Sequence, residues 1–154
     1  MANLNALKVA VEAATRQRDD ARRLLQQAQR SRTAAQGQLA QIEGYAAEVQ
    51  ARWGAQEGAV IPPERLFHHY QFLGRLDHAA SLQQTVLADQ DQRLAVATQA
   101  LLRAELRLTS LRKVLERREQ EQALQQMRRD QKQTDESAAL KYRHTHTATA
   151  AQEE

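Results

Sequence analysis

The chain has 154 residues, a formal net charge of +3 and no cysteine, and its five glycines and two prolines are too few for a sheet-rich fold. No apolar run approaches the ~20 residues that span a bilayer, and the amino terminus lacks the apolar core of a signal peptide. We therefore expect a soluble, cytoplasmic, helical protein without disulfides.

An apolar stripe with heptad spacing occupies the first third of the chain. Its members recur on alternating steps of three and four residues, which is the spacing of a coiled coil. Only Arg18 and Arg32 interrupt it. We predict a helix from about residue 4 to residue 53, with a seam that comprises Leu4, Leu7, Val11, Ala14, Ala21, Leu25, Ala28, Ala35, Leu39, Ile42, Ala46, Val49 and Trp53.

A breaker follows at residues 54–63, where Gly54, Gly58, Pro62 and Pro63 predict a loop. A second helix is predicted from about residue 64 to residue 142, because prolines are tolerated at a helix start and a new stripe begins there. Its members at seven-residue spacing are Leu66, Leu73, Ala80, Leu87, Leu94, Leu101, Leu108 and Leu115, with Leu76, Ala97, Ala104 and Leu111 between them. Residues 143–154 are small and polar, and we predict that they form a disordered tail.

Two stripes of similar length on either side of a breaker predict that the helices bury each other. The expected fold class is all-α, a long antiparallel two-helix coiled-coil hairpin with an extended C-terminal helix overhang. Residues 1–142 would form this single domain. An alignment that places Trp53 beside Leu66 brings Leu4 opposite Leu115, and the second helix continues beyond that point without a partner.

Aromatic side chains gather near the predicted loop. We interpret Trp53 as packing that closes the end of the seam. Tyr45 and Phe72 each precede a seam position by one residue, so they lie on the flank of the interface. Exposed aromatic residues on such a flank indicate either a partner-binding surface or simple packing, and the sequence leaves both open.

The remaining polar residues give no sign of catalysis. Arginines crowd the end away from the loop, but acidic residues interrupt them at salt-bridge spacing, which is typical of a solvated face. His68 and His69 project in different directions, and His144 and His146 fall in the predicted tail, so no metal site is expected. We expect no enzyme, no cofactor and no bound nucleic acid.

The chain resembles the FliJ family, the small coiled-coil component of the bacterial flagellar type III export apparatus, from about Leu4 to Tyr142. Three places carry the resemblance: Gln38-Leu39 leading to Tyr45, Tyr70-Gln71-Phe72 with Leu76 and Ala79, and Asp130-Gln131-Lys132 followed by Asp135-Glu136.

This resemblance implies a non-enzymatic stalk that supports flagellar assembly, motility and chemotaxis. Its partners would be the hexameric export ATPase (FliI-like) and the cytoplasmic domain of the membrane export gate (FlhA-like), with export chaperones as a further class. The stalk would be cytoplasmic and peripheral at the inner membrane, without inserting into it. The residues implied for the gate contact are Gln38, Ile42, Tyr45, Phe72, Leu76 and Ala79. Those expected inside the ATPase ring are Arg128, Arg129, Asp130, Gln131 and Asp135.

Two positions depart from the family pattern, since Val49 stands where a second aromatic residue is common and Gln83 occupies a later polar position. Three alternative functions stay open. One is the equivalent stalk of a virulence type III secretion system. The others are a basic coiled coil that binds nucleic acid and a holding chaperone whose exposed aromatic end grips unfolded chains.

Overall fold

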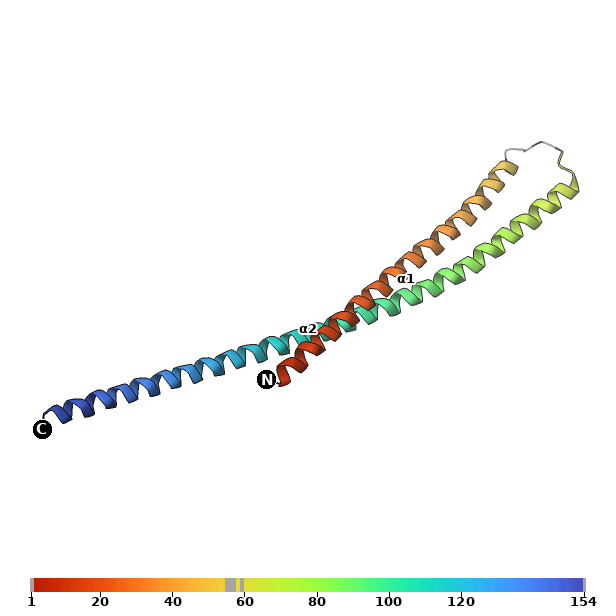
Figure 1. Ribbon diagram of the computed structural model, residues 1–154. Coiled ribbons are helices and arrows are strands. Elements are labelled where there is room, and N and C mark those ends of the chain that lie inside the picture. Colours follow the sequence, from red (N-terminus) through yellow and green to blue (C-terminus); the bar gives the residue numbers. More distant parts are fainter. Residues whose placement is uncertain (1, 55–57, 59, 154) are drawn as a thin grey trace. The chain divides into compact units, whose positions relative to one another are not determined.

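The computed structural model describes residues 2–54, 58 and 60–153, and these residues form two helices, α1 (Ala2–Gly54) and α2 (Pro63–Gln152) (Figure 1). No strand occurs among them. They divide into two compact units, which we describe separately. The hairpin unit contains residues 15–106, and the terminal unit contains residues 1–14 and 107–154.

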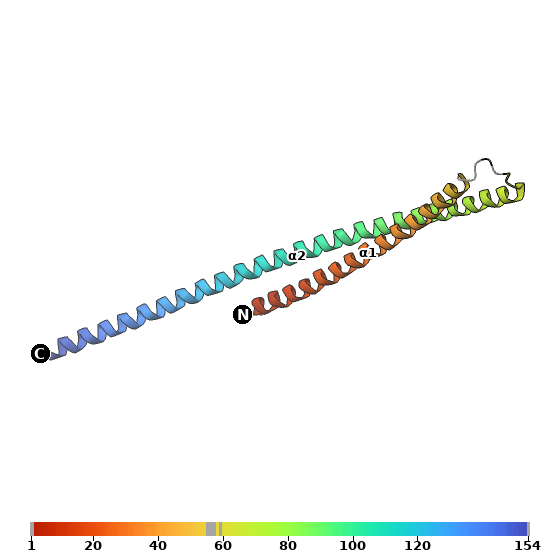
Figure 2. The ribbon, with the colours of Figure 1, turned by 90° about the horizontal axis from the view of Figure 1, so that it is seen from above.

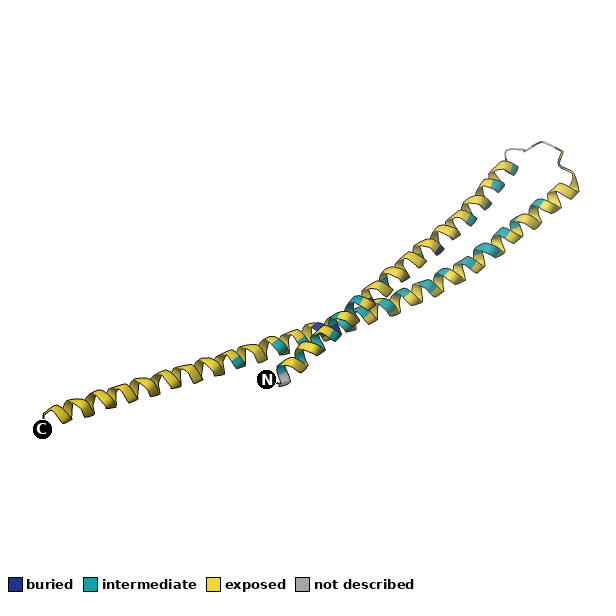
Figure 3. Cartoon of the chain, viewed as in Figure 1, coloured by how far each residue is buried: buried dark blue, intermediate teal, exposed yellow. Residues whose placement is uncertain are grey.

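In the hairpin unit, α1 and α2 run in opposite directions from the segment that connects them, side by side in both views (Figures 1 and 2). The predicted all-α antiparallel hairpin is therefore confirmed. Its buried stripe is thin: Ala21 and Ala35 are buried on α1, and most other seam residues are half-buried (Figure 3). Every predicted seam position of α1 in this unit is buried or half-buried, and so are the two interrupting residues, Arg18 and Arg32.

The helix ends lie at residue types that are common at such ends. Gly54 is the last residue of α1, and Pro63 is the first residue of α2, where its missing N–H costs nothing. The backbone N–H of Leu66 donates to the carbonyl of Pro62 at 3.2 Å and closes the first turn. The predicted boundaries thus agree within two residues for three of the four helix ends; residues 55–57 and 59 of the predicted loop lie outside the described residues.

Gly58 adopts a φ of 93°, a left-handed conformation that L side chains rarely adopt. We expect Gly58→Ala to lower the free energy of unfolding by about 1 kcal/mol, because the Cβ strains this backbone. Gly37→Ala, within α1 and with open space around its Cβ, should instead raise stability by about 0.5–1 kcal/mol. Urea unfolding followed by circular dichroism measures both changes, and effects of the same sign would contradict this prediction.

The terminal unit pairs the start of α1 with a longer part of α2 than the sequence predicts. Ala14 and Leu108 are its most buried side chains, each 2% exposed. On α2, Gln122 is half-buried one heptad after Leu115, and Leu4 lines a groove with residues of α2 from Arg118 to Arg129. The paired part therefore extends about a heptad beyond the predicted end at Leu115, because glutamine methylenes can cover a thin seam where leucines stop.

The predicted disordered tail is helical over most of its length. Helix α2 continues to Gln152, so residues 143–152 differ from the expectation. No proline or glycine interrupts this stretch, and the hydroxyl groups of Thr145 and Thr147 donate to the carbonyls of Lys141 and Arg143, four residues earlier. All described residues beyond Gln122 are exposed, so local interactions within α2, from the backbone and from side chains, hold this part of the helix.

Over the described residues, neither helix carries an apolar stretch that is long enough to cross a bilayer.

Candidate partner-binding surfaces

Tyr45 of α1 and Phe72 of α2 meet across the hairpin unit. Their rings make an edge-to-face contact with centroids 5.9 Å apart and an interplanar angle of 88°. Both side chains nevertheless stay accessible, since Tyr45 is 47% and Phe72 is 38% exposed. The pair thus packs internally and also presents aromatic surface to solvent, so packing accounts for part of each ring, and the partner-binding interpretation stays a prediction.

The other residues of the implied gate contact surround this pair. Ile42 and Leu76 are half-buried on the seam, Ala79 is half-buried on the flank, and Gln38 is exposed. We call these six residues, Gln38, Ile42, Tyr45, Phe72, Leu76 and Ala79, the aromatic flank. They come from both helices, so the surface exists only while the helices are paired.

Gln83 joins the two helices beside the aromatic flank. Its Nε2 donates to the backbone carbonyl of Ala35 at 2.9 Å and to Oε1 of Gln38 at 3.0 Å. The position that departs from the family pattern is therefore engaged inside the hairpin. Sequence reasoning did not identify this role, although Gln83 interrupts the apolar stripe of α2 in the way that Arg32 interrupts that of α1.

The seam ends near the loop in a second aromatic contact. The ring of Trp53 stacks on His69 with centroids 4.0 Å apart and an interplanar angle of 27°, and both residues are half-buried. This geometry agrees with the interpretation of Trp53 as packing. Phe67 and Tyr70 lie on the same end of α2 and are each 65% exposed.

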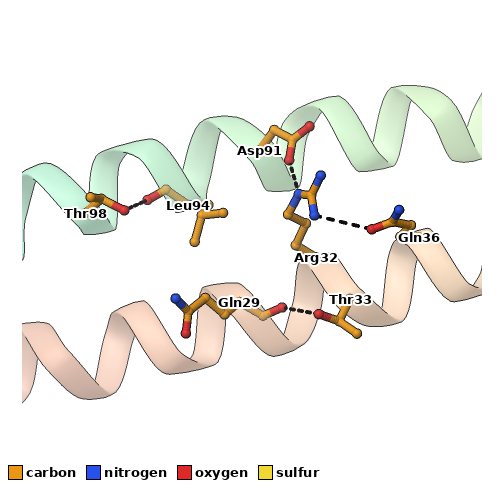
Figure 4. Close-up of polar contacts among 7 residues, drawn as sticks. All are labelled: Gln29, Arg32, Thr33, Gln36, Asp91, Leu94 and Thr98. Atoms are coloured by element: carbon orange, nitrogen blue, oxygen red, sulfur yellow. Dashed lines mark hydrogen bonds and ion pairs between the residues drawn. The ribbon is translucent and has the colours of Figure 1, made fainter.

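Ion pairs join or flank the helices of the hairpin unit. The guanidinium of Arg32, on a seam position of α1, contacts the carboxylate of Asp91 on α2 and donates to Oε1 of Gln36 at 3.3 Å (Figure 4). Arg22 reaches Glu105 of α2 at 4.0 Å. Arg23 pairs with Asp20 within α1 at the spacing that the sequence indicates, whereas the two cross-helix pairs are not given by spacing along one helix.

The residues expected inside the ATPase ring do not form one surface. Arg128, Gln131 and Asp135 share one exposed face of α2. Arg129 lies instead in the groove beside Leu4, and Asp130 accepts a hydrogen bond from Gln126 at 3.1 Å. The five residues therefore offer two faces of α2 to a partner.

In the described part of the chain, no three histidine or acidic side chains gather as a metal-binding group. The surfaces offered by the two units are those of helices, with aromatic, amide and charged side chains.

Comparisons with known proteins agree with this architecture. The family model described as Flagellar FliJ protein matches residues 3–147. The solved structure of a YscO homologue from Chlamydia trachomatis aligns with a TM-score of 0.70 at 19% sequence identity, over 93% of this chain and 93% of that one, a likeness that shows the fold. No curated protein matches the sequence at a significant level. Since the family model covers nearly the whole chain, the protein belongs to the FliJ family, the coiled-coil stalk components of type III protein export.

Proposed function

We propose that this protein is the stalk of a flagellar type III export apparatus, which couples the export ATPase ring to the cytoplasmic domain of the membrane export gate without performing chemistry. The aromatic flank carries this proposal, because an accessible aromatic pair in a thin coiled coil has the character of a binding site. Membership in the FliJ family supports an assignment to a type III export apparatus. The description of the family model as a flagellar protein favours the flagellar system.

The aromatic flank is the proposed contact for the export gate. Tyr45 and Phe72 would lose their remaining exposure against the gate domain, and burial of aromatic surface is a main source of binding energy at hot spots. Gln38 lies at the edge of the flank with its amide already oriented by Gln83. Binding therefore requires little rearrangement of the hairpin unit.

The last part of α2 is the proposed contact for the ATPase ring. Beyond Gln122 its described side chains are all exposed, and they carry charges of both signs. The face of Arg128, Gln131 and Asp135 would contact the ring, with Asp130 and Arg129 on the second face. Charges of both signs can orient α2 within the ATPase ring, and such a contact does not require an apolar surface to be buried.

Coupling follows from the continuity of the helices. Each helix is an unbroken hydrogen-bonded ladder, and α2 contains no proline after its first residue. A change of state imposed at one surface would reach the other through this ladder and the paired seam. The stalk would then be cytoplasmic and peripheral at the inner membrane through the gate, and its loss would impair flagellar assembly, motility and chemotaxis.

The equivalent stalk of a virulence type III secretion system is the second candidate. The similarity in fold to a YscO homologue favours it, and the same two surfaces would serve there.

Truncation after Glu121 tests the assignment of the ATPase contact. This variant lacks all five proposed ring residues, so it should no longer stimulate the purified export ATPase, while it still binds the gate domain. Truncation after Ala139 is the matched control, because it keeps Arg128 to Asp135 and removes only the remainder of α2. Pull-down with each partner and an ATPase assay give the result. Full stimulation by the shorter variant would refute the ring assignment.

A further inference from the structure

The apolar seam of the hairpin unit is too regular to fix how the two helices align. Along α2, leucine or alanine recurs at every seventh position, from Leu73 to Leu101. A shift of α2 by one heptad therefore places a similar apolar side chain at each of these positions again. Hydrophobic burial alone distinguishes poorly between such alignments.

The connection between the helices does not fix the alignment either. A heptad shift moves one helix along the other by about 10 Å. The eight residues 55–62 can span up to about 28 Å when fully extended. The chain between the helices is thus long enough to accommodate a shifted alignment.

Charged residues break this ambiguity. Arg32 pairs with Asp91 (Figure 4), and Arg22 reaches Glu105, so two pairs of opposite charge join the helices of the hairpin unit. Asp91 and Glu105 are two heptads apart, and the equivalent positions one heptad away from Asp91 hold Gln84 and Thr98. A shift by one heptad in either direction would therefore leave Arg32 without a carboxylate.

We propose that the Arg32–Asp91 pair is a register lock, which selects one alignment of α1 and α2 among several that the apolar seam allows. Gln83 adds to the selection through its bonds to Ala35 and Gln38. Gln83 discriminates against a shift in one direction only. A heptad shift that brings Leu76 to the place of Gln83 loses these hydrogen bonds, whereas the opposite shift brings Gln90, which has the same amide group. Unlike Gln83, the Arg32–Asp91 pair discriminates against shifts in both directions.

Burial of the pair supports a role in specificity and not in stability. The side chains of Arg32 and Asp91 are 37% and 50% exposed, and ion pairs with this exposure add little to the free energy of unfolding. Arg32 also occupies a seam position where an apolar residue would pack better. A polar residue at such a position fixes the alignment of coiled-coil helices at a cost in stability.

The lock has a consequence for the aromatic flank. Tyr45 and Phe72 come from different helices and meet only in this alignment. A shift of one heptad would bring Ala79 or Arg65 opposite Tyr45 instead of Phe72. The value of the lock for gate binding rests on the proposed function, whereas the lock itself is a property of the hairpin unit and is tested without any partner.

The chain contains no cysteine, so pairs of introduced cysteines report the alignment. Ser31→Cys with Val86→Cys lies on the flank of Tyr45 and Phe72, two heptads before Tyr45 in α1 and two heptads after Phe72 in α2. A short bismaleimide should link this pair in the native alignment. Ser31→Cys with Ala79→Cys, and Ser31→Cys with Arg93→Cys, report shifts of one heptad in the two directions. Each pair is placed in the full chain and in the variant Arg32→Leu with Asp91→Leu.

In the otherwise unchanged chain, only the native pair should be linked. In the leucine variant, linkage of a shifted pair relative to the native pair should rise at least about fivefold, which corresponds to a loss of about 1 kcal/mol of discrimination. The melting temperature of this variant should stay the same or rise. The swapped variant, Arg32→Asp with Asp91→Arg, should restore linkage of the native pair alone.

Two results would overturn the proposal. One is exclusive linkage of the native pair in the leucine variant, especially with a lowered melting temperature, since the pair would then only stabilise the fold. The other is linkage of a shifted pair in the otherwise unchanged chain. Circular dichroism confirms that every variant keeps its helices, so neither result can arise from unfolding.

Discussion

Replacement of Leu108 by alanine is expected to lower the free energy of unfolding by about 3 kcal/mol. Leu108 is 2% exposed and is the largest fully buried side chain of the described residues. The seam between two helices offers few other atoms that could move in and fill the space it leaves, so both the burial and the packing contacts are lost. Urea unfolding followed by circular dichroism at 222 nm measures the change.

Leu106→Ala is the matched control for this prediction. Leu106 lies two residues earlier on the same helix and is 60% exposed. Its truncation removes little buried surface, and the expected change is within about 0.5 kcal/mol. Equal losses for the two leucines would mean that the seam does not pass through Leu108, and the arrangement of the terminal unit would have to be revised.

Phe72→Ala is expected to weaken binding of the export gate domain by about thirtyfold, the effect of losing about 2 kcal/mol at a hot spot. Phe72 supplies exposed aromatic surface and also holds Tyr45 through their edge-to-face contact. The substitution therefore removes the Phe72 ring from the binding surface and also removes the contact that orients Tyr45. Isothermal titration calorimetry with the purified gate domain measures the dissociation constant.

Phe67→Ala distinguishes binding at a defined site from non-specific hydrophobic binding. Phe67 is an exposed aromatic residue on the same helix, 65% exposed, and it lies outside the aromatic flank. Its loss should change the dissociation constant by less than about twofold. A comparable loss for Phe67 and Phe72 would contradict a defined gate surface and would favour the holding chaperone, which grips clients through any exposed aromatic residue.

The helices and their ends were predictable because they depend on local chemistry. Heptad spacing predicts the seam of α1 position by position, and the prolines before Glu64 predict where α2 begins. The helical residues 143–152 were not predictable in this way. Small polar residues suggested disorder, but the absence of glycine and proline left the backbone ladder of α2 uninterrupted to Gln152.

The candidate surfaces were predicted in part. Flank positions one residue before the seam correctly placed Tyr45 and Phe72 at the edge of the hairpin, and the structure brings their rings together. The pairing of Gln83 with Gln38 could not be derived, because a glutamine on a heptad position can turn toward solvent or toward the partner helix. The division of the overhang residues between faces of α2 follows from helical periodicity, whereas the groove that Arg129 shares with Leu4 depends on where the start of α1 lies, which spacing does not specify.

The sequence alone determines that this protein consists of two amphipathic helices with a break between them, since periodicity and helix breakers are properties of neighbouring residues. Tertiary structure decides which residues of the two helices lie opposite each other, because a repeating apolar seam satisfies several alignments almost equally. Contacts between distant residues, such as Arg32 with Asp91 and Tyr45 with Phe72, distinguish among those alignments and assemble a surface that neither helix has by itself.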